Sequence, residues 1–318
     1  MTFFEKHRKA LLSAIVAIVI PLLMPACEKI VEFDVEEMTP MVVVNSLPCT
    51  DSGLFVNITY SRFFLDNSTF RAVEDASVSI DVGGRLYYST GRDGANYLLP
   101  YTATAGDTIT LHVAVDGREI TGGTRIPPLP PIENYSALLD TFQPITSGEI
   151  RFTINDHAGT DNYYYIYISE RDSGTRWNDW FECWDTIDTT YHCYFNCTDL
   201  DLTSPEVSSM EGFMGYFNNL LFTDKRIDGE SHEVLMSIMM LKDTAEHPLK
   251  REYTLVIQSL SREAYIYREA VMAAGSMASY FAEPARVYSN LSSGIGIFAA
   301  FSKREYPITF IYKEPEED

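Results

Sequence analysis

Residues 108–121 read Thr-Ile-Thr-Leu-His-Val-Ala-Val-Asp-Gly-Arg-Glu-Ile-Thr, and this stretch decides the fold class. Polar and apolar side chains alternate over 108–115, which is the period of a β-strand with one buried face. Asp116-Gly117 is a dipeptide that favours a two-residue hairpin turn, and residues 118–121 then return as a second strand. The stretch therefore predicts an antiparallel hairpin with one face in a hydrophobic core.

The residues before this hairpin repeat the same pattern. Short alternating or β-branched runs occupy 41–44, 55–61 and 76–82, and Gly83-Gly84 marks a turn into the run at 85–88. About six or seven short strands with turns between them are typical of a β-sandwich. We therefore expect a mainly β protein whose first domain, residues 41–126, is an immunoglobulin-like or transthyretin-like sandwich.

A proline-rich stretch follows this predicted domain. Residues 127–131 read Pro-Pro-Leu-Pro-Pro, a composition that favours a stiff, extended connector. Residues 132–318 are again rich in strand-forming residues and are expected to form a second β-rich domain with one main α-helix near 261–280, capped by Ser261. Within that domain, residues 171–211 are polar and are expected to be irregular.

The amino terminus carries the features of an export signal. Lys6, Arg8 and Lys9 form a basic head, and the apolar run 10–24 is shorter than the roughly 20 residues that cross a bilayer. Ala26-Cys27 then matches the end of a bacterial lipobox. We predict a signal peptide at 1–26, attachment of fatty acyl chains such as palmitate at Cys27, and a lipidated tether at 27–40. The alternatives are an ordinary signal peptide followed by an incidental cysteine, and an uncleaved anchor.

The charge of the chain limits its partners. The formal net charge is −21, and the few basic residues near the amino terminus would leave with the signal peptide. Such a surface repels phosphate groups, so we expect no nucleic-acid partner and no adhesion of the folded surface to anionic lipid.

Several short runs resemble one known family. They are 26–29 with 40–44, 74–78, 94–97, 221–224 with 228–229, and 283–290 with 294–298. In this order they resemble the family of the domain of unknown function 4249, over nearly the whole mature chain. The resemblance implies an envelope lipoprotein of the Bacteroidota, encoded beside TonB-dependent outer-membrane transporters. It implies no catalytic residues.

The cysteines after Cys27 allow two interpretations. Cys183, Cys193 and Cys197 lie within fifteen residues, and an exported protein would favour a disulfide from Cys183 to Cys193 or Cys197. The alternative is a zinc site that uses these three cysteines and His192, although their spacing lacks the paired Cys-x₂-Cys pattern. Cys49 is expected to be a buried thiol.

All three tryptophans of the chain fall in one short segment with a phenylalanine. On an exposed loop such rings bind sugars or protein partners, whereas under an irregular segment they would form a small satellite core. The residues are Trp177, Trp180, Phe181 and Trp184.

The remaining polar clusters favour no chemistry. Asp185, Asp188, Asp199 and Asp201 fit no EF-hand spacing, and Asp156 and His157 with Asp161 are typical of a polar turn. The common hydrolase and phosphate-loop motifs are missing from the sequence. We therefore expect no metal, no cofactor and no catalytic residue. The sequence favours a non-catalytic binding or accessory module, and the family resemblance implies that it acts at the cell surface as a partner of a TonB-dependent transporter in nutrient uptake. The alternatives are a surface-exposed hydrolase, and an adhesin or structural surface protein.

Overall fold

The computed structural model describes residues 39–50, 52–63, 66–142, 145–178, 180–202, 216–240, 249–275 and 287–312. The predicted signal peptide, Cys27, nearly all of the tether, the end of the predicted helix at 276–280 and the last residues of the chain lie outside these ranges. Pro40–Asp318 form one compact unit. Within the described ranges, no helix combines the length and the apolar character that crossing a bilayer requires.

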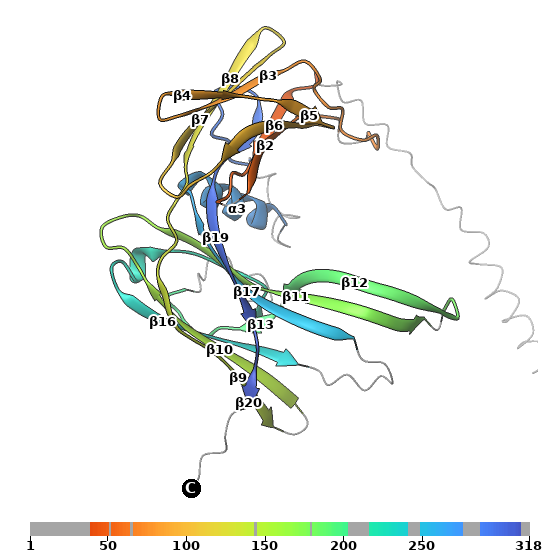
Figure 1. Cartoon of the computed structure of the whole chain (residues 1–318), viewed down its shortest axis with the longest axis vertical. Coiled ribbons are helices and arrows are strands. Elements are labelled where there is room, and N and C mark those ends of the chain that lie inside the picture. Colours follow the sequence, from red (N-terminus) through yellow and green to blue (C-terminus); the bar gives the residue numbers. More distant parts are fainter. Residues whose placement is uncertain are drawn as a thin grey trace, which may run out of the picture. The chain divides into compact units, whose positions relative to one another are not determined.

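The amino-terminal part is a sandwich of two β-sheets, as predicted (Figure 1). The alternating residues of the longer strands face a shared core that includes Val56, Ile80 and Leu111, which are buried almost completely. One sheet has the order β18-β1-β2-β6-β5 and the other β4-β3-β7-β8. Their strands are β1 (Val42–Ser46), β2 (Gly53–Tyr60), β3 (Ser77–Val82), β4 (Arg85–Tyr88), β5 (Gly91–Asp93), β6 (Asn96–Thr102), β7 (Thr108–Val115), β8 (Arg118–Arg125) and β18 (Ile295–Phe298).

The predicted hairpin turns of this sandwich are present. Gly83 and Gly84 join β3 to β4, and Asp116 and Gly117 join β7 to β8, all four with positive φ angles. Positive φ at both central residues is what the tight turns of twisted hairpins require, and glycine adopts it without steric cost. The turn residues therefore set the register in which the buried side chains of these strands alternate.

A segment from the other end of the chain completes the first sheet. β18 pairs in parallel with β1, and the register places Gly296 beside Val44 and Phe298 beside Ser46. Asn290 fastens this segment, because its side chain bonds both the N–H and the C=O of Phe298 and also the carbonyl of Gly123. Residues 41–126 thus form the sandwich together with residues 295–298, which the sequence had assigned to the second domain.

The described strands of 132–312 other than β18 form a second pair of sheets. Their shared core includes Phe152, Ile166 and Ile257, which are fully buried. One sheet has the order β14-β13-β16-β10-β9-β20, and the other has β12-β11-β17-β19 with β15 also paired to β11. The strands are β9 (Ile132–Phe142), β10 (Ile145–Asn155), β11 (Tyr163–Asn178), β12 (Cys183–Cys193), β13 (Phe195–Asn196), β14 (Tyr216–Phe217), β15 (Leu220–Thr223), β16 (Ser231–Met240), β17 (Lys250–Leu260), β19 (Phe301–Ile308) and β20 (Ile311–Tyr312).

The predicted helix is α3 (Arg262–Gly275), and a short 3-10 turn, η2, spans Asp224–Arg226. Ser261 caps α3 as expected, since its Oγ accepts a hydrogen bond from the N–H of Ala264 at 3.2 Å. The same Oγ accepts a hydrogen bond from the N–H of Ala300. The start of the helix is therefore tied to the segment that follows β18. Ala264 packs in a small cluster with Ile297 and Leu260.

One prediction about this part of the chain was wrong. Residues 171–211 were expected to be irregular, but β11 continues to Asn178 and β12 returns from Cys183 in an eleven-rung antiparallel ladder. Residues 203–211 lie outside the described ranges. The last rung that β11 shares with β17 joins Ser173 to Lys250. Beyond it, residues 174–187 continue as a two-stranded ribbon, and Figure 1 shows this hairpin of β11 and β12 extending past β17.

Candidate functional site

The end of the β11–β12 hairpin, residues 177–184, concentrates the largest exposed aromatic side chains. Trp180 and Phe181 stand at the turn and are 94% and 78% exposed. Trp177 and Trp184 lie on the adjoining strands and are 45% and 53% exposed. A cluster of large exposed apolar side chains is more informative than a single one, and aromatic residues are enriched at the centres of interfaces. We call residues 177–184 the aromatic apex; the structure brings all four predicted binding residues together there.

The exposure of these rings decides between the two interpretations of the tryptophans. A satellite core would bury them under neighbouring segments. Instead, Trp177 and Trp184 face each other across the ladder, with ring centroids 5.6 Å apart in an edge-to-face arrangement. Cross-strand aromatic pairs of this kind stabilise a hairpin by about 0.2–1 kcal/mol. The tryptophan pair therefore braces the ribbon, whereas Trp180 and Phe181 have no comparable packing role.

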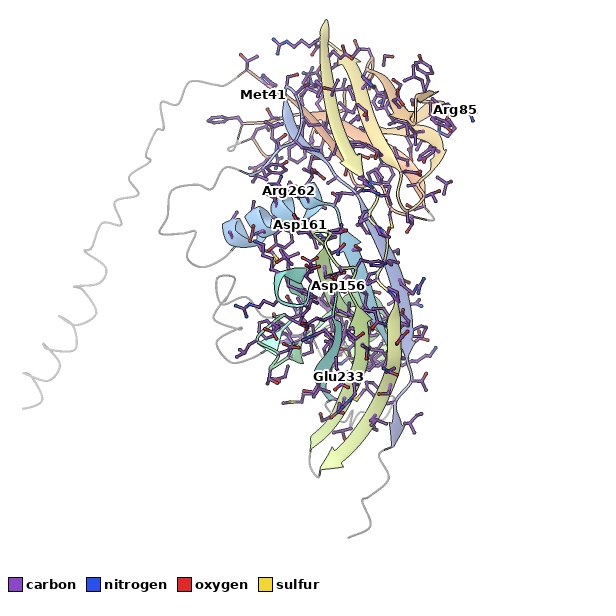
Figure 2. The ribbon with its side chains drawn as sticks, turned by 90° about the vertical axis from the view of Figure 1, so that its left-hand side faces the viewer. Met41, Arg85, Asp156, Asp161, Glu233 and Arg262 are labelled. Carbon is purple, nitrogen blue, oxygen red and sulfur yellow. The ribbon has the colours of Figure 1, made fainter. Side chains whose placement is uncertain are left out.

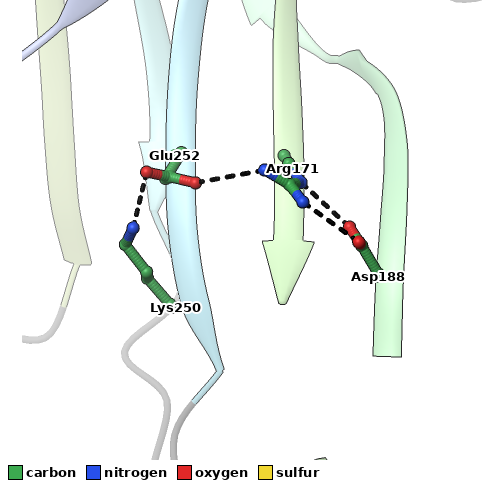
Figure 3. A network of polar contacts seen from close by, with 4 residues as sticks. All are labelled: Arg171, Asp188, Lys250 and Glu252. Atoms are coloured by element: carbon green, nitrogen blue, oxygen red, sulfur yellow. Dashed lines mark hydrogen bonds and ion pairs between the residues drawn. The ribbon is translucent and has the colours of Figure 1, made fainter. Parts of the chain in front are cut away.

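The base of the ribbon is held by charged side chains (Figure 3). Arg171 donates two hydrogen bonds to Asp188, at 2.9 and 3.0 Å, and lies 3.8 Å from Glu252. Glu252 in turn pairs with Lys250 at 2.6 Å. The arginine lowers the pKa of the Asp188 carboxyl through these hydrogen bonds and its charge. This network spans β12, β11 and β17, so it fixes the ribbon to the sheet where the third strand begins.

The predicted disulfide is wrong for this fold. Cys183 and Cys193 are the first and last residues of β12, and ten residues of strand separate their Cα atoms by about 33 Å. A disulfide needs Cα atoms within about 7 Å. Cys197 is buried in the same core cluster as Cys193, whereas Cys183 is exposed, and all three residues are thiols in the structure. Closeness in sequence did not become closeness in space, because the segment between them is extended.

The alternative zinc site is not formed either. Cys193 points into the core, where burial raises the pKa of its thiol to about 12. His192 lies on the opposite face of β12 and stacks on Tyr167, with ring centroids 4.1 Å apart. Successive residues of a strand face opposite sides of the sheet, so these two neighbours cannot bind one ion together.

We predict that one of these thiols reacts with a water-soluble reagent in the folded protein. Cys183 is exposed, whereas Cys193, Cys197 and Cys49 are buried. Desolvation, followed by the charge and hydrogen bonding of the Asp185 carboxylate, raises the pKa of the Cys183 thiol, so its reaction should quicken above neutral pH. In the lipidated protein, labelling should modify Cys183 within minutes and the other three only after unfolding in guanidinium chloride. Peptide mapping that finds Cys183 in a disulfide would contradict this assignment.

Three carboxylates meet where the loop after β10 approaches η2. The ligand atoms of Asp156, Asp224 and Asp228 all lie within 4.8 Å of one another, and Figure 2 marks Asp156 in this region. Oxygen ligands at this spacing could hold a hard cation such as Ca²⁺. Asp224 Oδ2 and Asp156 Oδ2 accept hydrogen bonds from the N–H groups of Asn162 and Gly229, at 2.7 and 3.0 Å. The cluster therefore already has a structural role, which is to join the two loops.

In this cluster, the charged form of the Asp224 carboxyl is disfavoured by burial and by the neighbouring acids. It is only 3% exposed, and desolvation raises the pKa of its carboxyl, with a further contribution from the charge of Asp156 and Asp228. Hydrogen bonds from Asn162 oppose that rise. Asp224 and Asp228 were not expected to be site residues, because they lie 68 and 72 residues after Asp156 along the chain.

The four aspartates that were weighed as calcium ligands do not form a common site. Each has a partner of its own. Asp185 accepts a hydrogen bond from Asn178, Asp188 pairs with Arg171, Asp199 with His232, and Asp201 lies 3.8 Å from Arg226. They act as separate surface acids that fasten neighbouring strands and loops.

A serine, a histidine and an acid do share one face of the first sandwich. Ser79 lies directly opposite His112 in the β3–β7 ladder, and His112 Nδ1 is 3.2 Å from Glu119 Oε1. They line an open depression of about 300 Å³. Acyl transfer also needs donors aimed at the developing oxyanion. Here β3 lies between β4 and β7, and β7 between β3 and β8, so their backbone N–H groups are committed to the ladders. The arrangement therefore does not favour the hydrolase interpretation.

Comparison with known proteins identifies a family for almost the entire chain. The family model of the Domain of unknown function (DUF4249) matches residues 28–306. The resemblance inferred from the sequence is thereby confirmed. No curated protein matches this chain.

Proposed function

The chain belongs to the DUF4249 family, and on that premise we propose that it is a lipid-anchored protein of the outer membrane. It acts at the cell surface as a non-catalytic accessory or binding partner of a TonB-dependent transporter in nutrient uptake. The basic head, the short apolar run and Ala26-Cys27 support the anchor and the export route. The aromatic apex is the observation that carries the binding role, because it exposes Trp180 and Phe181 on a braced ribbon.

The chemistry of the described residues favours binding over catalysis. The three-aspartate cluster is bonded within the protein, and the serine–histidine–glutamate face is open and without aimed donors. By contrast, the aromatic apex offers rigid, apolar surface that gains free energy when it is covered. The segment that joins regular strands at a surface is also where binding residues are most often found.

We predict that the full-length, lipidated protein co-purifies with a TonB-dependent transporter from gently solubilised outer membranes. Replacing residues 175–186 with an Asn-Gly turn should lower the recovered transporter at least about tenfold, which corresponds to about 1.4 kcal/mol. The new turn would join Gly174 to Ile187, which already face each other in the ladder. The removed residues lie beyond the last rung shared with β17, so the melting temperature should change little. Mass spectrometry of the eluate identifies and quantifies the transporter.

Two results would contradict this prediction in different ways. A wild-type protein that recovers no transporter would overturn the proposed function. A shortened variant that recovers the transporter as well as the wild type would place the binding surface outside the ribbon.

A further inference from the structure

The turn of the aromatic apex is held by one side chain. Asn178 Oδ1 accepts hydrogen bonds from the N–H groups of Trp180 and Phe181, at 3.0 and 3.3 Å. Asn178 Nδ2 donates to Asp185 on the returning strand at 2.6 Å, and Glu182 closes the turn with a φ of 48°. The two most exposed rings are therefore displayed by a turn of fixed geometry.

The ribbon beneath this turn is also preorganised. The Trp177–Trp184 pair braces it near the turn, and the Arg171–Asp188 ion pair fixes it at its base. A binding element that is ordered before binding loses less conformational entropy in the complex. Exposed aromatic anchors contribute most to affinity when they fill a well-packed, desolvated pocket of the partner.

The charges around the two rings restrict what can cover them. Glu182 is exposed beside Phe181, and Asp185 follows closely, with Arg176 opposite it as the one basic residue in the described part of the ribbon. The whole chain carries a net charge of −21. An anionic membrane surface would repel this apex, whereas a protein surface with lysine or arginine side chains would attract it.

We infer that Trp180 and Phe181 enter an apolar pocket of a protein partner, and that basic side chains line the rim of this pocket. The inference rests on the proposed function and adds to it the two residues that enter the partner and the chemistry of the surface that receives them. Trp177 and Trp184 are positioning residues in this arrangement, because they hold the ribbon straight beneath the turn.

The test compares variants of the full-length, lipidated protein in capture of the transporter. Trp180→Ala with Phe181→Ala should weaken capture at least about 100-fold, since two interface anchors are lost. The melting temperature should stay unchanged, because neither ring is packed. Tyr88→Ala is the matched control, since it removes an aromatic ring that is 61% exposed on β4, and capture should be normal.

Reversing the charge of Glu182, beside the two rings, tests the basic rim in the same capture experiment. Glu182→Lys should weaken capture about tenfold at low salt, and the difference from wild type should shrink as salt is raised. The same Glu182→Lys change should have no effect if the rim of the pocket is neutral, and that result would overturn the basic rim.

A vesicle-binding measurement distinguishes a protein pocket from a membrane as the surface that receives the two rings. Vesicles of phosphatidylethanolamine and phosphatidylglycerol should not bind a soluble form of the protein that lacks residues 1–38. Vesicle binding that is lost in the Trp180→Ala, Phe181→Ala variant would overturn the inference in favour of membrane insertion.

If the wild type captures the transporter and the double variant captures it equally well, the inference falls and the proposed function stands. If the wild type captures no transporter, the proposed function itself falls.

Discussion

Gly296→Ala is expected to destabilise the protein by about 3–5 kcal/mol, which is a large part of the stability of a typical domain. Gly296 has a φ of 119°, a region that side chains rarely allow. A Cβ atom built there would lie 2.0 Å from the carbonyl oxygen of Val44. Since that oxygen belongs to the paired backbone of β1, the alanine can be accommodated only if β18 moves away from the sheet.

The expected loss of stability follows from the side chains that β18 buries. Ile297 and Phe298 are 1% and 0% exposed, and they pack in two different clusters on either side of the strand. Displacing the strand would uncover both side chains, and loss of a buried phenylalanine alone costs about 3–5 kcal/mol. Urea denaturation should show the loss as a lower midpoint.

Gly123→Ala is the control for this substitution. Gly123 lies on β8 of the same sandwich, but a Cβ atom there would meet nothing within 4 Å. Its effect should stay within about 1 kcal/mol. If Gly296→Ala proved equally mild, β18 would not be part of the first sheet.

The sequence predicted the elements whose signal is local. Residues 108–121 alternate because one face of each strand is buried, and the observed hairpin of β7 and β8 turns at Asp116-Gly117. β12 carries no such signal. Both faces of residues 183–192 are mostly in water, so Thr, Asp and Trp alternate without a hydrophobic period. For that reason the strand was expected to be irregular, and its cysteines were expected to be close together.

Elements that depend on distant pairing were not predictable in this way. β18 pairs with β1, some 250 residues away, and the glycines at 294 and 296 are more typical of a loop. The four aromatic residues of the candidate site were identified, but their exposure was not, because it depends on β17 beginning at Lys250 and leaving the ribbon uncovered. Asp224 meets Asp156 only through the arrangement of two loops.

The residues that carry the family resemblance have structural roles in this fold. Asp224 accepts the N–H of Asn162, and Gly229 donates to Asp156 where the two loops join. Asn290 bonds both polar backbone groups of Phe298, and Gly296 permits the close contact with Val44. The resemblance therefore identifies the scaffold, whereas binding specificity is expected in the aromatic apex, which lies outside those runs.

Cys27→Ser is expected to remove the protein almost completely from the membrane fraction, or to leave it as an unprocessed precursor. Each buried CH₂ group of an acyl chain contributes about 0.8 kcal/mol, and stable anchoring requires more than one chain. Without them the protein would depend on its folded surface, which anionic lipid repels because the whole chain carries a net charge of −21. The described residues offer no membrane-spanning helix as a substitute.

Fractionation of cells that express Cys27→Ser, Cys183→Ser and the wild type would measure this effect. Cys183→Ser is the matched control, because it removes a thiol that is exposed on the folded surface and should leave the protein at the membrane. Mass spectrometry of the wild type should show a mature chain that begins with an acylated Cys27. A mature chain that starts elsewhere without lipid, or a Cys27→Ser protein that stays with washed membranes, would show that another element provides the anchor. In that case the aromatic apex, the largest exposed aromatic group in the described structure, would be the first candidate for membrane contact.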